Sequence, residues 1–149
     1  MASKTEFLAA EGSAGDWEEA IRLCGKHIVE AGYADQRFVE ECVAREREYP
    51  TGLPSDVPVA MPHCKSEGIK KNCVCFMKLD SPVEFRRMDD DSQTIKTRIV
   101  LNLALKSDDH LQFLQKLIGL VMDSETVGQC LSAPLEDVPA LLAKEVAKE

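Results

Sequence analysis

The sequence predicts an α/β fold: a three-layer domain in which a mixed, mostly parallel sheet of about five strands is flanked by helices on both faces. Helical patterns open and close the chain, and β-rich segments fill its middle. The β-rich segments are apolar over most of their length, as strands buried on both faces are. No segment repeats, and none has the composition of a linker, so we expect residues 1–149 to form one domain.

Composition excludes two classes of partner. Hydrophobic residues make up 44% of the chain, charged residues 30%, and the net charge is -8. So acidic a chain repels phosphate backbones, and without a basic patch we expect no nucleic-acid binding. No apolar run reaches the length of a membrane span, and the N-terminus lacks the pattern of a signal peptide. We therefore expect a cytoplasmic protein without direct membrane insertion, whose six cysteines are reduced.

The first third of the chain predicts a short strand or arm and two helices. The strand or arm is expected at residues 7–10. Asp16 is placed to cap a helix that ends near Gly32. Asp35 is expected to cap a second helix. That helix should stop before Pro50, because the residue that precedes a proline is poorly suited to helix.

The middle of the chain predicts the remaining strands, and the last third predicts helices. The strands are expected at residues 57–61, 72–79 and 98–105, with extended structure resuming at 83–85 after a turn at Ser81-Pro82. The helices are expected to begin at residues 108–109, 124 and 134.

The first functional candidate is His63, which follows Pro62 at the end of the predicted strand 57–61. Proline has no backbone donor and fixes its own φ, so the strand should end there. The imidazole of His63 would then lie just beyond the end of a core strand, where open α/β sheets commonly carry reactive groups. A neutral imidazole is a nucleophile at physiological pH.

A second histidine and an arginine cluster are candidates to complete a phosphoryl-transfer site. His110 lies in the first turn of the helix after strand 98–105, where free amides favour an anion. Arg45 and Arg47 lie near the end of the second helix. Phosphoryl transfer needs mainly positioning and positive charge, which imidazoles and a guanidinium supply. The structural alternative is that these histidines only pack and that Arg-Glu-Arg-Glu is a solvated helix face.

Several motifs resemble a known family, the type-2 (fructose/mannitol-type) IIA components of the bacterial sugar phosphotransferase system. They are Arg45-Glu46, Pro50-Thr51-Gly52, Val59-Ala60-Met61-Pro62-His63 and Asp109-His110-Leu111-Gln112-Phe113-Leu114. The resemblance covers nearly the whole chain. It implies a mixed sheet between helices and a phosphotransferase that uses no cofactor. The run from Tyr49 to Leu53 is most similar to the galactitol-type subgroup, so galactitol or a related polyol is expected.

The resemblance also implies roles for individual residues. His63 is implied to be the phosphorylated residue, accepting phosphate from the phosphocarrier protein HPr and passing it to a cysteine of the cognate IIB component, which serves the IIC membrane permease. His110 is implied to be the second active-site histidine. Counting back from Pro50-Thr51 makes Arg45 the family's arginine, whereas counting back from His63 without a gap favours Arg47. The Pro-Thr motif leads us to expect Arg45, with Arg47 as the second candidate.

Two other functions remain as alternatives. A regulatory, nitrogen-type IIA module would keep the fold and His63 but act by protein contact. A metal-binding protein would use His63 with Cys64, Cys73 and Cys75, and His110 as a further ligand. Cys73 and Cys75 would share one face of a strand. However, structural zinc sites usually place two or more residues between paired ligands.

Overall fold

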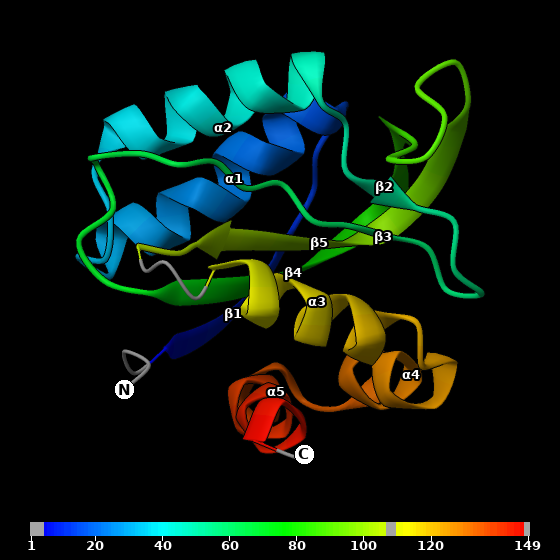
Figure 1. The fold of residues 1–149 in the computed structure, drawn as a ribbon. Coiled ribbons are helices and arrows are strands. Elements are labelled where there is room, and N and C mark those ends of the chain that lie inside the picture. The colour runs from blue at the N-terminus through cyan, green and yellow to red at the C-terminus, as the bar shows by residue number, and fades with distance from the viewer. Residues whose placement is uncertain (1–4, 107–109, 148–149) are drawn as a thin grey trace.

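Helices α1 and α2 cover one face of a five-stranded sheet, and α3, α4 and α5 cover the other (Figure 1). The computed structural model describes residues 5–106 and 110–147, with the side chain of His110 left out. The elements in chain order are β1 (Glu6–Gly12), α1 (Trp17–Glu30), α2 (Gln36–Glu48), β2 (Gly52–Leu53), β3 (Val59–Ala60), β4 (Cys73–Arg86), β5 (Thr94–Ala104), α3 (His110–Val121), α4 (Ser124–Ser132), the 3-10 turn Leu135–Asp137 and α5 (Val138–Ala147). The helix start predicted at residues 108–109 lies outside the described residues.

The sheet has the strand order β1-β4-β5-β3-β2. The pairs β1–β4 and β3–β5 are parallel, and the pairs β4–β5 and β2–β3 are antiparallel. These pairings confirm the predicted mixed five-strand sheet between helices. Parallel pairs are half of the total rather than most of it, because β4 and β5 are sequence neighbours joined by a short connection and therefore lie antiparallel.

Carboxylate caps start the first two helices, as predicted. The side chain of Asp16 accepts a hydrogen bond from the backbone N–H of Glu19 at 2.8 Å. Asp35 accepts one from the backbone N–H of Arg37 at 3.0 Å. Each bond satisfies a donor that the first turn of a helix leaves unpaired. Gly32 follows α1 with a φ of 86°, a left-handed conformation that favours glycine.

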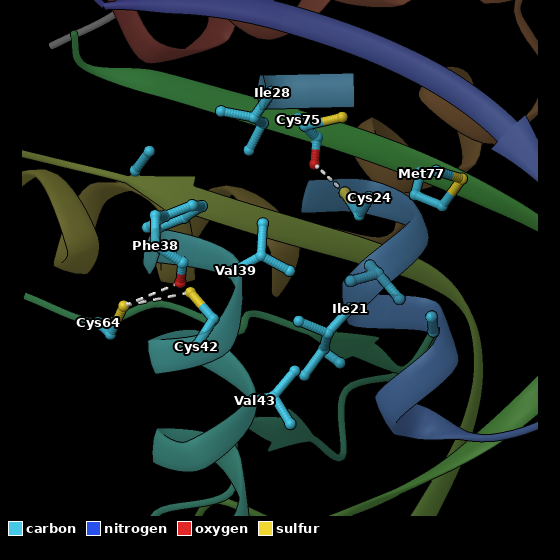
Figure 2. Packing of buried hydrophobic residues seen from close by; sticks show 14 of the residues in the cluster. Ile21, Cys24, Ile28, Phe38, Val39, Cys42, Val43, Cys64, Cys75 and Met77 are labelled. Carbon is cyan, nitrogen blue, oxygen red and sulfur yellow. Dashed lines mark hydrogen bonds between the residues drawn. The ribbon is translucent and has the colours of Figure 1, made fainter. Parts of the chain in front are cut away.

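The sheet separates two apolar cores. On the side of α1 and α2, apolar side chains from both helices meet the sheet, among them Ile21, Ile28, Phe38, Val39 and Met77 (Figure 2). On the other side, Leu101 and Leu103 of β5 pack with Leu117 and Leu142. Val100 of β5 belongs to the first core. The second half of β5 feeds both cores, so residues 99–104 are all buried, whereas its first half alternates between exposed and buried residues.

The strand that leads to His63 is shorter than predicted. β3 contains only Val59–Ala60, and prolines precede and follow it closely. Neither proline has a backbone donor for a ladder bond. The chain nevertheless continues along β5, because the N–H of Leu103 donates to the carbonyl of Pro62 at 3.0 Å. His63 forms an isolated parallel bridge with Leu103, so it lies beyond β3 but still beside the central strand.

β4 is continuous where the sequence predicts a turn at Ser81-Pro82. Its register against β5 shifts between Lys78 and Val83, which is an irregularity of the kind that accommodates a proline inside a strand. The long β4–β5 ribbon extends past the body of the sheet (Figure 1). Its end returns to β2, where the N–H of Met88 donates to the carbonyl of Gly52 at 2.8 Å.

In the described part of the chain, none of the helices is long and apolar enough to cross a bilayer.

Close packing of α1 on α2 gives a stability prediction at Gly25. A Cβ there would lie 2.8 Å from Cγ2 of Val39, a stiff and buried side chain. Crowding of this kind costs about 1–3 kcal/mol. This cost should outweigh the gain of up to about 1 kcal/mol from a better helix former. We therefore expect Gly25→Ala to lower the free energy of unfolding in urea.

Gly128 of α4 is the matched control, because a Cβ there would meet no atom within 4 Å. Gly128→Ala should raise the free energy of unfolding by about 0.5–1 kcal/mol. Equal stabilisation by both substitutions would contradict the close approach at Gly25.

Candidate functional site

His63 is half-buried, and its ring is hydrogen-bonded to its own loop. The Nδ1 atom lies 2.7 Å from the carbonyl oxygen of Met61. A carbonyl oxygen can only accept a hydrogen bond, so Nδ1 carries the proton of the neutral ring and Nε2 carries the lone pair. The loop therefore sets both the orientation and the tautomer of the imidazole.

The two residues before His63 are anchored to separate segments, Pro62 to β5 and Met61 to Thr51. The carbonyl of Pro62 accepts from the Leu103 N–H and from Nδ2 of Asn102, each at 3.0 Å. The N–H of Met61 lies 3.2 Å from Oγ1 and 3.4 Å from the carbonyl oxygen of Thr51, just before β2. Met61 and Asn102 are fully buried. The backbone at His63 is consequently held from both sides.

Two adjoining hollows of about 690 and 520 Å³ open beside His63. Both are lined by His63, by Arg45 and Glu48 from the end of α2, and by Leu114 of α3. The structure thus brings His63 and Arg45 together against a wall formed by α3. His110 begins α3, one turn before Leu114, but its side chain lies outside the described residues.

The larger hollow has an apolar and acidic rim. Tyr49 is 58% exposed and Met88 is 40% exposed. Beside them lie the carboxylates of residues 89–91. Asp89 pairs with Arg87 at 2.5 Å, and this arginine lowers the pKa of Asp89. Lys65 lines the smaller hollow and adds a cation there.

Arg45 and Arg47 have different surroundings. The Arg45 guanidinium lies over the Tyr49 ring, 4.4 Å from its centroid, at the edge of both hollows. Arg47 turns towards α1, where its Nη2 lies 2.7 Å from a carboxylate oxygen of Glu18 and its guanidinium lies 5.5 Å from the Trp17 ring centroid. Arg47 lines neither hollow. The geometry therefore places Arg45, and not Arg47, beside His63.

Glu46 does not fit the structural alternative given for the Arg-Glu-Arg-Glu run. That alternative was a solvated helix face, whereas Glu46 is buried. Glu46 is only 3% exposed, and its two carboxylate oxygens accept from the N–H and the Oγ1–H of Thr51, each at 2.8 Å. Burial raises the pKa of Glu46 to about 7, although the bonds from Thr51 and the charge of Arg86 oppose the shift. The signal was present in the sequence, since Glu46 follows Val39, Cys42 and Val43 at helical spacing on the apolar face.

The cysteines lie in the apolar cores. Sγ of Cys64 is 3.3 Å from Sγ of Cys42, and Sγ of Cys24 donates to the carbonyl of Cys75 at 3.5 Å (Figure 2). Burial raises the pKa of Cys42 and of Cys24 well above the usual value. Among residues 5–106 and 111–147, no three histidine, cysteine or acidic side chains converge as metal ligands. Cys64 contacts Cys42 of α2, which is not one of the ligands proposed for the alternative zinc site.

The raised pKa of Glu46 predicts a pH-dependent stability. The unfolded carboxyl titrates near 4.5 and the folded one near 7, so the folded state binds more protons between these values. Stability should therefore fall as pH rises from about 5 to 8, by about 2–3 kcal/mol from this group alone. Glu46→Gln removes the titration. In urea unfolding measured at several pH values, the difference between wild type and Glu46→Gln should change by that amount, and parallel curves would contradict it.

Comparison with known proteins places the chain in a family. The family model for the phosphoenolpyruvate-dependent sugar phosphotransferase system, EIIA 2, matches residues 3–144. A galactitol-specific EIIA component of Escherichia coli K12 is 22% identical over 141 residues, which cover 94% of each chain. The mannitol-specific EIICBA component of the same strain is 30% identical over 131 residues, which are 85% of this chain but 20% of that longer protein.

A solved structure agrees with these relatives. The mannitol enzyme IIA of E. coli, in its complex with phosphorylated enzyme IIB, superposes with a TM-score of 0.72. It is 26% identical to this chain, and the match covers 89% of this chain and 90% of that one. With a family model that spans residues 3–144, the resemblance noted in the sequence is confirmed: the chain belongs to the EIIA type-2 family of the phosphoenolpyruvate-dependent sugar phosphotransferase system.

Proposed function

We propose that the protein is a phosphoryl carrier of a sugar or polyol phosphotransferase system and that His63 is its acceptor. Family membership supports a role in phosphoryl transfer. The observation that carries the assignment is the hydrogen bond between Nδ1 of His63 and the Met61 carbonyl, at 2.7 Å. It keeps the Nε2 lone pair ready as a nucleophile beside a hollow that also contains Arg45.

The transfer consists of two displacements at phosphorus. Nε2 of His63 attacks the phosphorus of phospho-HPr, and the bond from phosphorus to the HPr donor atom breaks as the P–Nε2 bond forms. A cysteine thiolate of the IIB component then attacks, an S–P bond forms, and the electron pair of the P–Nε2 bond returns to Nε2. Nδ1 keeps its proton on the Met61 carbonyl through both steps, so the ring needs no proton transfer. The protein contributes mainly positioning and charge.

Two further residues are assigned supporting roles. Arg45 would stabilise the charge on the phosphoryl oxygens, because its planar guanidinium offers several donors and lies at the edge of both hollows. His110 would support the phosphorylated ring, since α3 begins at His110 and its next turn, at Leu114, lines the same hollows. The start of α3 also provides backbone N–H groups, which favour an anion.

The rim of the larger hollow is suited to protein partners, and we assign HPr and a IIB component to it. Tyr49 and Met88 expose aromatic and methionine side chains, types that are enriched at protein interfaces. The acidic residues 89–91 would favour partners with basic surroundings. The structural relative in complex with phosphorylated enzyme IIB supports the second partner. The galactitol preference predicted from residues 49–53 stays a prediction, because the relatives include galactitol- and mannitol-specific components.

Phosphate labelling tests the acceptor. Incubation with phosphoenolpyruvate, enzyme I and HPr should place an acid-labile phosphate on Nε2 of His63, seen by mass spectrometry and by 31P NMR. His63→Ala should abolish the label without loss of folding, since the side chain adds little to either core. His110→Ala should be labelled at His63 about 10²-fold more slowly, as expected for loss of one stabilising group. Labelling of His63→Ala at His110 would overturn the assignment.

The same labelled protein distinguishes a transporter component from a regulatory nitrogen-type module. A galactitol-type and a mannitol-type IIB component would each be added, and transfer to the IIB cysteine would be followed by loss of label from His63. Transfer to either one supports the proposed carrier function, and a preference between them reports the polyol. Phosphate that stays on His63 with both IIB components would favour the regulatory alternative.

A further prediction distinguishes Arg45 from Arg47, which lie two positions apart on the same helix. Arg45→Gln should slow label uptake from phospho-HPr by about 10²-fold or more, because it removes charge beside the transferring group. Arg47→Gln is the matched control and should change the rate by less than about threefold, since the contacts it loses, an exposed ion pair with Glu18 and the approach to the Trp17 ring, both lie on α1. A larger loss in Arg47→Gln than in Arg45→Gln would reverse the assignment.

A further inference from the structure

A buried hydrogen-bond path joins the carboxyl of Glu46 to the ring of His63. Oε1 of Glu46 accepts from Oγ1–H of Thr51 at 2.8 Å, and the same Oγ1 accepts from the N–H of Met61 at 3.2 Å. The carbonyl of Met61 in turn accepts from Nδ1 of His63 at 2.7 Å. Glu46 and Thr51 are each 3% exposed, so water does not compete for these bonds.

We propose that Glu46 is a positioning residue for His63, which acts through Thr51 and Met61 to hold the imidazole in the Nδ1–H tautomer. The inference rests on the proposed function of His63 as the phosphoryl acceptor. It assigns to Glu46 a role that needs no contact with the phosphoryl group or with either partner.

The direction of the Thr51 hydroxyl is the first step of the argument. A hydroxyl rotates and can be donor or acceptor. With a carboxylate oxygen 2.8 Å away, the hydroxyl hydrogen points at Glu46, which leaves an Oγ1 lone pair for the N–H of Met61. Without an acceptor at Glu46, the hydroxyl hydrogen can turn towards that N–H, and two donors would then face each other. Glu46 thus decides whether the Thr51 hydroxyl can hold the N–H of Met61, whose other acceptor is the more distant Thr51 carbonyl at 3.4 Å.

The fixed position of the Met61 carbonyl is the second step. Thr51 holds the N–H on one side of Met61, and Leu103 with Asn102 holds the carbonyl of Pro62 on the other. The Met61 carbonyl between these anchored groups has little freedom and remains directed at Nδ1. A loosened Met61 would weaken the bond that excludes the Nε2–H tautomer, in which the nucleophilic lone pair is lost from Nε2.

The position of Glu46 in the chain adds a second consequence. Glu46 directly follows Arg45, so its bonds to Thr51 tie the end of α2 to the segment that carries His63. The same contact therefore sets the spacing between the Arg45 guanidinium and the His63 imidazole.

Burying a carboxyl is costly, and an apolar side chain would pack at this position at less cost. A buried carboxyl with a raised pKa beside a cleft is typical of a functional site.

The test measures the tautomer of His63 and the rate of phosphoryl uptake in the same full-length proteins. Long-range 1H–15N NMR of labelled histidine reports which ring nitrogen is protonated, and label uptake from phospho-HPr reports the rate. Thr51→Val removes the hydroxyl with little change of shape. Glu46→Gln leaves one of the two Thr51 donors without its acceptor. Each should reduce the Nδ1–H fraction and slow uptake by about three- to tenfold, the effect of one net hydrogen bond.

Three further variants make the test specific. Thr51→Ser keeps the hydroxyl and should retain the wild-type tautomer and rate. The double variant Glu46→Gln with Thr51→Val should be no slower than the slower single variant, because both break one path. Thr126→Val is the matched control, since Oγ1 of Thr126 is buried and bonds to Asp123 at the start of α4. Thr126→Val should leave both readouts unchanged.

The outcomes separate this inference from the proposed function. If the wild type is labelled at His63 but Glu46→Gln and Thr51→Val keep the wild-type tautomer, the positioning role is wrong. Multiplicative rate losses in the double variant, or a Thr51→Ser variant as impaired as Thr51→Val, would also overturn it. If the tautomer shifts as expected but no phosphate reaches wild-type His63, the positioning role stands and the carrier function fails.

Discussion

The site depends on one contact, the attachment of the Pro62 carbonyl to β5 by the Leu103 N–H and the Asn102 amide. β5 is the central strand, and both of its faces are buried from Ile99 to Ala104. Attachment to this strand fixes the position of His63, even though His63 belongs to no regular element. The two prolines around β3 make this arrangement necessary, because they remove the donors that would otherwise continue the ladder. The prolines thus end β3 before His63, and Asn102 with Leu103 keeps the histidine beside β5.

Three consecutive charged residues near the end of α2 point in different directions. Arg45 lies at the hollows, Arg47 pairs with α1, and Glu46 between them points inward. Three consecutive residues of a helix point about 100° apart, so one turn can place a cation at the hollows, a cation against α1 and an acceptor in the core. The separation of roles follows from helical geometry. It explains why two arginines only two positions apart have such different neighbours.

The sequence predicted the helices and the order of layers well, because these depend on local signals. Asp16 and Asp35 cap as expected, and Pro50 follows the end of α2. The strands were predicted less well, because pairing is not local: Pro82 signals a turn in isolation, yet β4 continues through it since β5 supplies partners on both sides of the irregularity. His63 and Arg45, which line the same hollows, were proposed from motifs. Glu46 was missed although its helical spacing from Val39, Cys42 and Val43 places it on the apolar face. Asn102 was missed because its bond to the Pro62 carbonyl joins residues 40 positions apart in the chain.

The end of the β4–β5 ribbon illustrates how one local feature serves the whole molecule. β2 is an edge strand, and edge strands expose donors and acceptors that can pair with another chain. Here the Met88 N–H occupies the Gly52 carbonyl, and glycine permits the approach, since a Cβ at Gly52 would lie 2.6 Å from the Arg86 carbonyl oxygen. The ribbon thereby pairs one acceptor of this sheet margin within the chain itself. A strand from another molecule therefore finds one acceptor fewer at this margin of the sheet.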